Sequence, residues 1–130
     1  MRQQKLPSIL LGDDEHTRLV ALANAVMEKN PDVADELLSE LERATVVVGK
    51  KPPPNVVRMG STVSYRADDQ ERQVTLVYPG DADIEAGRIS ILTPIGAALI
   101  GLKAGQSIDW KARDGRTHRL TILQVVQQPD

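Results

Sequence analysis

The chain has 130 residues, which is enough for one ordinary domain or for a small domain with a helical appendage. Hydrophobic residues make up 41% of it, but there is no Phe and no Cys, with one Trp and two Tyr. The core must therefore be aliphatic. Disulfides, thiolate zinc sites and cysteine nucleophiles are excluded, and aromatic platforms for stacking nucleobases are not expected.

The formal net charge is −2, but the charged residues are distributed unevenly along the chain. Residues 1–49 carry nine acids and five bases, whereas residues 50–130 carry nine acids and eleven bases. An acidic part on a mildly basic remainder suggests an interaction protein, although helix surfaces are often acidic without such a role. No apolar run approaches the roughly 20 residues of a membrane helix, and the start is a poor signal peptide, so we expect a cytoplasmic protein with no membrane partner.

Two short amphipathic helices are predicted first. Asp13, Asp14 and Glu15 suit the start of a helix over 13–29, and Asn30-Pro31 ends it and begins the next. The apolar positions follow the spacing i, i+3, i+4 and i+7, namely Leu19, Leu22, Ala23 and Val26, then Ala34, Leu37, Leu38 and Leu41. Such a pair predicts an antiparallel, coiled-coil-like helical hairpin over 1–49.

The next segment, 50–55, contains three consecutive prolines and cannot continue a helix. We interpret it as a semi-rigid linker to a second domain over 56–130. Within that domain apolar residues recur with period 2, at Val63, Tyr65, Val74, Leu76, Tyr78, Ile108, Trp110, Leu120 and Ile122. Asp114-Gly115 is a good hairpin turn, and the fold class is α+β, an antiparallel sheet packed on one helix over 94–102.

The junction before that helix is the most informative feature. Ile89 and Ile91 predict a short strand, Thr93 is a candidate N-cap, and Pro94 suits the first helical position because its missing N–H costs nothing there. Gly101 supplies the stop.

Two short patterns resemble ligand-binding motifs, one a phosphate loop and the other a calcium loop, but each also has a simple structural interpretation. Gly96 and Gly101 are spaced as in a phosphate loop, but Leu102 stands where that loop needs Lys, so close packing is favoured. Asp81, Asp83 and Glu85 resemble the start of a calcium loop, but the Gly and the final Glu of that motif are misplaced, so we favour a solvated loop.

No catalytic, metal-binding or cofactor-binding residue is predicted. His16 and His118 lack ligand spacing, and no serine stands in a nucleophile elbow. Carboxylate pairs that form only in space remain possible general acids.

Four bases near the last hairpin could contact nucleic acid through phosphates. They are Lys111, Arg113, Arg116 and Arg119. Strand alternation would expose several of them in any case, so a solubilising surface is the favoured interpretation.

Three stretches resemble a known family in order and approximate spacing. They are 59–63 (MGSTV), 75–79 (TLVYP) and 105–110 (GQSIDW). Together with the junction at 89–102, they resemble the C-terminal domain of the bacterial Gre-type (GreA/GreB) transcript cleavage factors, whose fold is similar to that of FK506-binding proteins. The resemblance is closer to their short relatives, the regulators of nucleoside diphosphate kinase (Rnk), and it covers 56–126, with a weaker match over the first 45 residues.

This resemblance implies a transcription regulator that binds RNA polymerase at the rim of its secondary channel. The matching contact loop contributes Ser90, Leu92, Thr93, Pro94 and Ile95, and nucleic acid would be met only within the polymerase. Full-length Gre-type factors present acids to the catalytic magnesium on a long coiled coil. The expected helices of about 16 residues span about 24 Å, which is well short of that arm. The resemblance therefore favours a competitor or modulator without cleavage activity.

Three alternatives stay open. The family name implies direct or indirect regulation of nucleoside diphosphate kinase, the FKBP-like fold implies a prolyl isomerase, and the final hairpin suggests a nucleic-acid-binding module. An isomerase would need an aromatic-lined pocket, which Tyr65, Tyr78 and Trp110 could hardly build.

Overall fold

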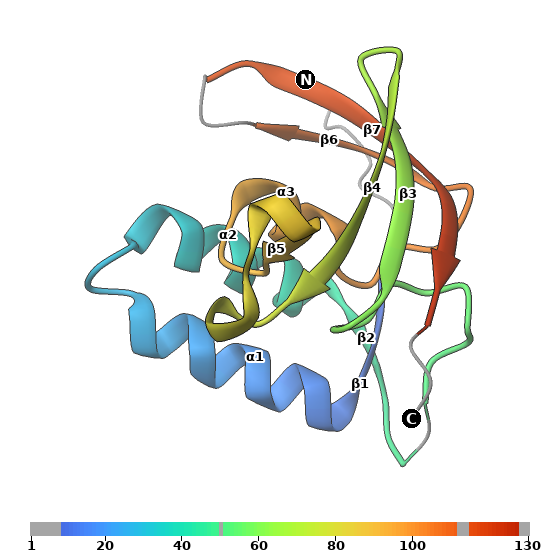
Figure 1. Ribbon diagram of the computed structural model, residues 1–130. Coiled ribbons are helices and arrows are strands. Elements are labelled where there is room, and N and C mark those ends of the chain that lie inside the picture. The colour runs from blue at the N-terminus through green and yellow to red at the C-terminus, as the bar shows by residue number, and fades with distance from the viewer. Residues whose placement is uncertain (1–8, 50, 112–114, 128–130) are drawn as a thin grey trace, which may run out of the picture.

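The computed structural model describes residues 9–49, 51–111 and 115–127 and has the predicted mixed α+β composition (Figure 1). Its helices are α1 (Asp13–Val26), α2 (Pro31–Arg43) and α3 (Pro94–Leu99), with two 3-10 turns, η1 (Pro79–Asp81) and η2 (Ile84–Ala86). Its strands are β1 (Leu10–Gly12), β2 (Thr45–Val47), β3 (Thr62–Ala67), β4 (Gln70–Val77), β5 (Arg88–Ser90), β6 (Ser107–Lys111) and β7 (Thr117–Val126). Within these ranges, no helix is long and apolar enough to span a membrane.

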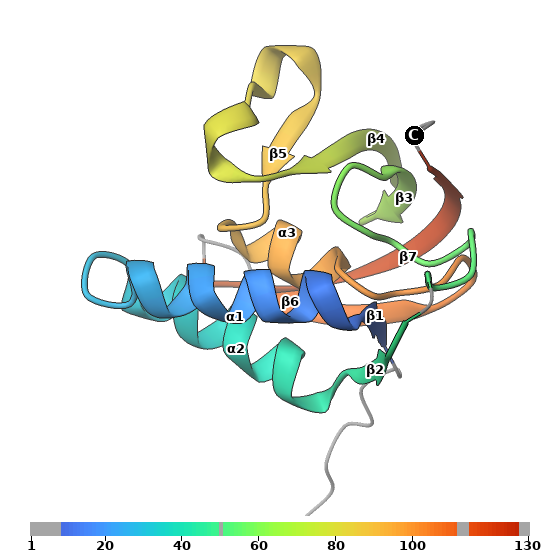
Figure 2. The same cartoon turned by 90° about the horizontal axis from the view of Figure 1, so that it is seen from below.

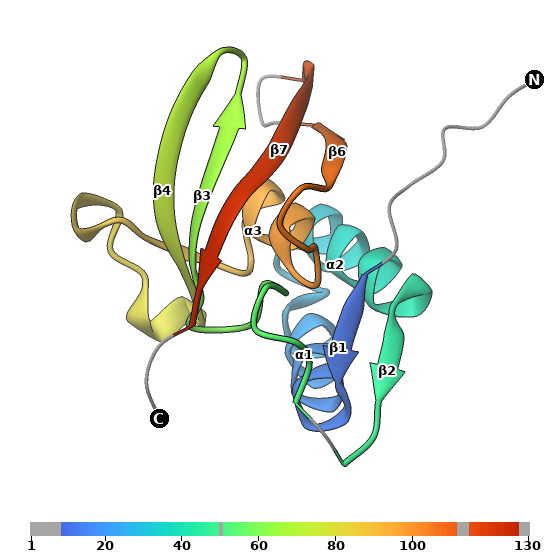
Figure 3. The same cartoon turned by 90° about the vertical axis from the view of Figure 1, so that its right-hand side faces the viewer.

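Five strands form a curved sheet in the order β5-β4-β3-β7-β6, which wraps around α3 (Figures 1 and 3). Neighbouring strands are antiparallel, as predicted, except that β5 runs parallel to β4. The parallel edge arises because η1 and η2 carry the chain back before β5 begins. Parallel neighbours always need such a crossover.

The helices α1 and α2 form the predicted antiparallel hairpin and lie side by side (Figure 2). The short strands β1 and β2, which precede and follow the hairpin, pair in parallel. Helix α2 also packs against α3. The hairpin therefore packs against the rest of the fold through the contact of α2 with α3.

One hydrophobic cluster joins the two parts of the chain. The residues with the predicted helical spacing contribute Leu19, Ala23, Ala34, Leu37 and Leu41, and those with strand spacing contribute Val63, Tyr65, Leu76, Ile108, Leu120 and Ile122. Residues on both sides of the proline run thus share one core. The division into 1–49, 50–55 and 56–130 stays a prediction.

Several local predictions need correction. Helix α1 ends at Val26 rather than Lys29. Helix α3 ends at Leu99 rather than 102, because Ile100 has a non-helical ψ of 131° and Gly101 has a φ of +81°. The N-cap of α1 is Gly12, so the early acids do not cap the helix. Asn30 is the N-cap of α2 but makes no side-chain capping bond.

Two further predictions concern loops. The segment 81–87, expected as a solvated loop, contains η2 and part of η1. The predicted turn at Asp114-Gly115 lies partly outside the described residues, although Gly115 has the positive φ, +81°, that such a turn requires.

Candidate functional site

The junction between β5 and α3 is held by short-range hydrogen bonds. Ser90 Oγ accepts the N–H of Leu92 at 2.9 Å, and Thr93 Oγ1 donates to the Ser90 carbonyl at 2.8 Å. Thr93 Oγ1 also accepts the N–H of Gly96 at 3.1 Å, so it is the N-cap that the sequence predicts. Pro94 follows at the first helical position. Its side chain is thus presented on a preorganised turn.

Close packing explains the two glycines that resemble a phosphate loop. A Cβ at Gly96 would overlap the Ser90 carbonyl oxygen and lie 3.0 Å from Ile91 Cα. At Gly101 it would lie 2.8 Å from Ile9 Cβ. Both positions therefore serve contacts between segments, as the sequence favoured.

An apolar groove of about 340 Å³ opens beside this junction. Four of the five residues predicted to contact RNA polymerase line it: Ser90, Thr93, Pro94 and Ile95. The other walls come from Ala82, Ile84, Arg88, Ile89 and Trp110. Leu92, the fifth predicted residue, packs against the hydrophobic core instead. The groove can accept one or two apolar side chains of a partner.

Sequence reasoning missed one wall of this groove. Ile84 lies in η2 and is 85% exposed. Its only signal in the sequence is an isolated aliphatic residue among the acids of 81–85, and periodicity does not reveal it because η2 is a single 3-10 turn.

Two of the three aromatic side chains, Tyr65 and Trp110, line one cavity of about 420 Å³ together with Ile95 and His118. Trp110 lines the groove, with its ring centroid 5.5 Å from that of His118. Tyr65 is buried under the sheet, and Tyr78 lies beneath the Arg18 guanidinium at 4.7 Å, in contact with the hairpin. Tyr78 does not line the cavity that Tyr65 and Trp110 share.

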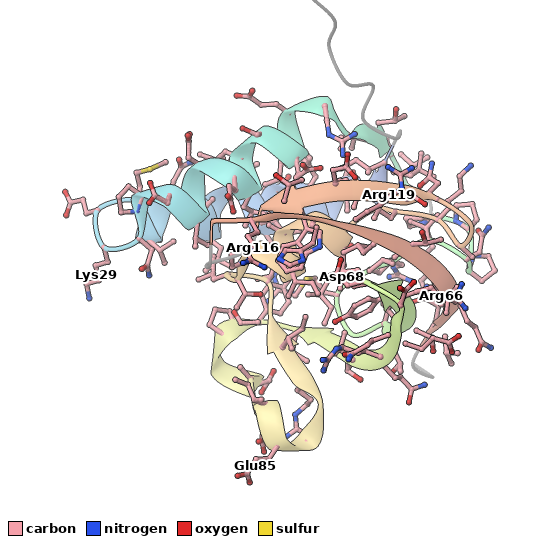
Figure 4. The ribbon with its side chains drawn as sticks, turned by 90° about the horizontal axis from the view of Figure 1, so that it is seen from above. Lys29, Arg66, Asp68, Glu85, Arg116 and Arg119 are labelled. Carbon is pink, nitrogen blue, oxygen red and sulfur yellow. The ribbon has the colours of Figure 1, made fainter. Side chains whose placement is uncertain are left out.

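A polar pair lies on the other side of Trp110. His118 Nδ1 is 2.6 Å from Asp68 Oδ2, and Asp68 itself has a positive φ of 51° in the β3–β4 turn (Figure 4). Tyr65 and Arg72 line the same cavity. No nucleophile completes the pair within the described part of this cavity, so we assign it no chemistry.

The carboxylates that resemble a calcium loop take part in local structure. Asp83 Oδ1 accepts the N–H of Ala86 at 3.3 Å, and Asp83 Oδ2 is 3.7 Å from Arg88. Arg88 Nε also donates to the Asp81 carbonyl at 3.1 Å. Across the described residues, no group of three or more His, Cys, Asp or Glu side chains is placed to hold a metal.

The bases proposed for nucleic-acid contact are only partly described. Arg113 and the side chain of Lys111 lie outside the described residues. Arg119 pairs with Asp109 at 3.1 Å, and Figure 4 shows it well separated from Arg116. The described part of this group therefore does not form a concentrated basic patch.

The acids near the hairpin turn are exposed and lie in the turn and on α2. Glu28 lies in the turn, and Asp32, Asp35 and Glu36 lie on α2. Figure 4 shows Lys29 at this end of the molecule, away from Glu85 on the β4–β5 connection.

Two family models match adjoining parts of the chain. Residues 7–47 match the model described as the Rnk N-terminus, and residues 52–127 match the model for the C-terminal part of the transcription elongation factors GreA and GreB.

Individual relatives give the same picture. The regulator of nucleoside diphosphate kinase of Escherichia coli (strain K12) is 34% identical over 126 residues, which cover 95% of this chain and 93% of that protein. Transcription elongation factor GreA of Rhodospirillum rubrum is 46% identical over 82 residues, so the match spans 62% of this chain but about half, 52%, of that protein. Among solved structures, a GreA/GreB elongation factor from Nitrosomonas europaea has a TM-score of 0.71 at 38% identity, covering 91% of this chain and 98% of that chain.

Proposed function

Because this chain belongs to the GreA/GreB family of transcription elongation factors, in the branch with an Rnk N-terminus, we propose that it binds RNA polymerase at the rim of the secondary channel. In this role it modulates or competes with Gre-type factors and does not cleave transcripts.

The observation that carries the proposal is the groove beside Pro94. Four residues of the predicted contact loop line one apolar hollow, and hydrogen bonds fix the turn that presents them. A preformed hollow lined by rigid side chains loses little entropy when a partner residue enters it. Such a surface suits a protein partner.

The proposed lack of cleavage activity depends on the length and position of the hairpin. Helix α1 has 14 residues and α2 has 13, so each spans about 20 Å. Both helices lie against the rest of the fold and share its core. With the groove docked at the channel rim, the exposed acids at the tip would stop short of a deeply placed magnesium ion. The hairpin then occludes the channel entrance.

A pull-down with core RNA polymerase, repeated with a full-length cleavage factor as competitor, tests this function. We expect Pro94→Ala to weaken binding about 5-fold or more, as for a truncated interface anchor. Val48→Ala is the matched control, because Val48 is 73% exposed after β2 and does not line the groove. Equal binding of wild type and Pro94→Ala, with both folded by circular dichroism, contradicts the proposal. Leu92→Asp is a poorer probe because it also disturbs core packing.

A second candidate function comes from the name of the Escherichia coli relative, a regulator of nucleoside diphosphate kinase. The described cavities contain no phosphate-loop geometry, which favours an indirect link. A direct effect would appear as a change in the turnover of purified kinase when this protein is added.

A further inference from the structure

The cavity that Tyr65 and Trp110 share has walls formed by two cross-strand pairs. Tyr65 on β3 lies opposite Arg72 on β4, and Trp110 on β6 lies opposite His118 on β7. Ile95 of α3, around which the sheet wraps, lines the same cavity (Figure 3). Directly opposite residues place their side chains on one face of a sheet, so these five meet around one hollow. Its volume of about 420 Å³ is in the range of small-molecule sites.

Tyr65 brings an unused hydroxyl group to this cavity. Only 4% of the residue's surface is exposed, yet the hydroxyl has no hydrogen-bond partner among the described residues. Burial raises the pKa of Tyr65 above its ordinary 10.0, so the hydroxyl keeps its proton at neutral pH and can donate it to an acceptor. Since polar groups of buried side chains are normally hydrogen-bonded, the cavity is the place from which a ligand would supply that acceptor.

Arg72 adds a positive charge close to that hydroxyl. Its guanidinium lowers the pKa of Tyr65 in opposition to burial, because the two side chains are neighbours. Arg72 donates to the Gln70 side-chain carbonyl at 2.9 Å, and in the part of the chain that the structure describes no carboxylate pairs with it. By contrast, Arg66 in the same hairpin pairs with Glu71. The Arg72 guanidinium is therefore held by a neutral group and keeps its charge for a ligand.

The remaining walls set the size and charge of that ligand. Ala67, Ile95 and the Trp110 ring offer apolar surface. Asp68 adds a carboxylate, which lies 2.6 Å from His118 Nδ1 and whose side chain is 61% exposed. With one guanidinium and one nearby carboxylate, the cavity suits a ligand with a single negative charge better than the doubly charged phosphate group.

We propose that this cavity binds a small organic monocarboxylate with an aromatic or branched aliphatic body. The carboxylate accepts hydrogen bonds from the Tyr65 hydroxyl and the Arg72 guanidinium, and the body lies against Ile95 and the Trp110 ring. Among their described lining residues, the cavity and the apolar groove share only these last two. The inference goes beyond the proposed function and does not depend on it.

Phenylacetate tests this inference with the intact protein. The chain has one tryptophan, so the fluorescence of Trp110 reports on the cavity that it lines. We expect a saturable change with a Kd of about 1 mM. Phenylacetamide, which lacks the charge, and acetate, which lacks the ring, should each bind about 10-fold more weakly or worse. Phenyl phosphate should bind no more tightly than phenylacetate, because of its second charge.

Substitutions locate the bound carboxylate. Tyr65→Phe removes only the hydroxyl and should weaken phenylacetate binding about 3- to 10-fold. Arg72→Gln removes the charge and should weaken it about 10-fold or more. Arg66→Gln is the matched control, because consecutive strand residues point to opposite faces and Arg66 does not line the cavity. Ile84→Ala is the control for the apolar groove, which Ile84 lines. Both controls should bind phenylacetate like wild type.

Several results would overturn the inference. It is wrong if phenylacetate causes no saturable change, if phenylacetamide or acetate binds as tightly as phenylacetate, or if phenyl phosphate binds more tightly. It is also wrong if Tyr65→Phe and Arg72→Gln, both folded by circular dichroism, bind like wild type. Should Arg72→Gln fail to fold, Tyr65→Phe decides alone. Weakened binding in Ile84→Ala alone would assign the ligand to the groove and likewise contradict the inference.

Discussion

The carboxylate of Glu15, in the first turn of α1, accepts the backbone N–H of Met59 at 3.2 Å, across 44 positions of the chain. Its second oxygen, Oε1, is buried and has no hydrogen-bond partner among the described residues. One helical turn later, Arg18 covers the ring of Tyr78. Polar contacts therefore tie the start of the hairpin to the segments before β3 and after β4, in addition to the shared core.

This contact predicts a pH-dependent effect of Glu15→Gln. Burial raises the pKa of Glu15 above its ordinary 4.5, against the opposing effects of the Met59 N–H, Arg58 and Arg18. The unfolded chain then loses this proton at lower pH than the folded chain does. The free energy of unfolding should fall as pH rises from 4.5 through the raised pKa of Glu15. At pH values above that pKa, the stabilisation that comes from protonated Glu15 is lost.

Because Gln does not titrate, Glu15→Gln should be about 1 kcal/mol more stable than wild type at pH 8 and close to it near pH 4. Urea unfolding at both pH values measures the difference. Asp14→Asn, which alters an exposed acid in the same helical turn, is the control. A Glu15→Gln advantage that is equal at both pH values would rule out titration of Glu15 as the cause.

Sequence periodicity predicts the elements whose stability comes from one buried face. Leu19 and Ala23 in α1 and Val63 and Tyr65 in β3 are buried as their spacing requires. The Thr93 cap was also predictable, because a cap and its helix lie within a few residues.

Features that depend on distant segments could not be predicted in this way. The β1–β2 pair joins two three-residue strands, one before and one after the hairpin in the sequence, with Leu11 opposite Val46. Ile84 becomes a groove wall only because η2 brings it beside Pro94. Neither has a local sequence signal, since each is determined by the packing of other elements.

Gly96→Ala should destabilise the fold strongly. The new Cβ would overlap the Ser90 carbonyl oxygen, and the backbone there has no room to move because Thr93 bonds to the same carbonyl. We expect a loss of about 3 kcal/mol in the free energy of unfolding, measured by urea denaturation. Gly80→Ala is the matched control, since a Cβ at Gly80 meets nothing within 4 Å. Similar losses for both variants would show that the close contact at Gly96 is unimportant.

Thr93→Ala should cost about 1–2 kcal/mol of stability, because it removes the cap of α3 and the bond to the Ser90 carbonyl together. Thr93→Ser keeps the hydroxyl and should retain most of that stability. Thermal unfolding of the three proteins measures the difference. If the Ala and Ser variants melt alike, then the hydroxyl does not fix the junction.

The last prediction concerns the exposed acids at the tip of the hairpin. Glu28→Gln, Asp32→Asn and Asp35→Asn, combined in one variant, should leave competition with a full-length cleavage factor for RNA polymerase nearly unchanged. The reason is that the helices span only about 20 Å and lie against the body, so docking at the channel rim leaves these carboxylates far from the catalytic magnesium. Competition is measured as the concentration of this protein that halves cleavage by the full-length factor.

Backtracked complexes given this protein alone provide the decisive comparison. Neither wild type nor the triple variant should accelerate RNA cleavage above the polymerase's own rate, whereas Pro94→Ala should reduce competition because it alters the groove. Metal-dependent cleavage that appears with wild type and disappears with the triple variant would contradict this prediction. The hairpin would then reach the active site despite its length, and the protein would act as a cleavage factor rather than a modulator.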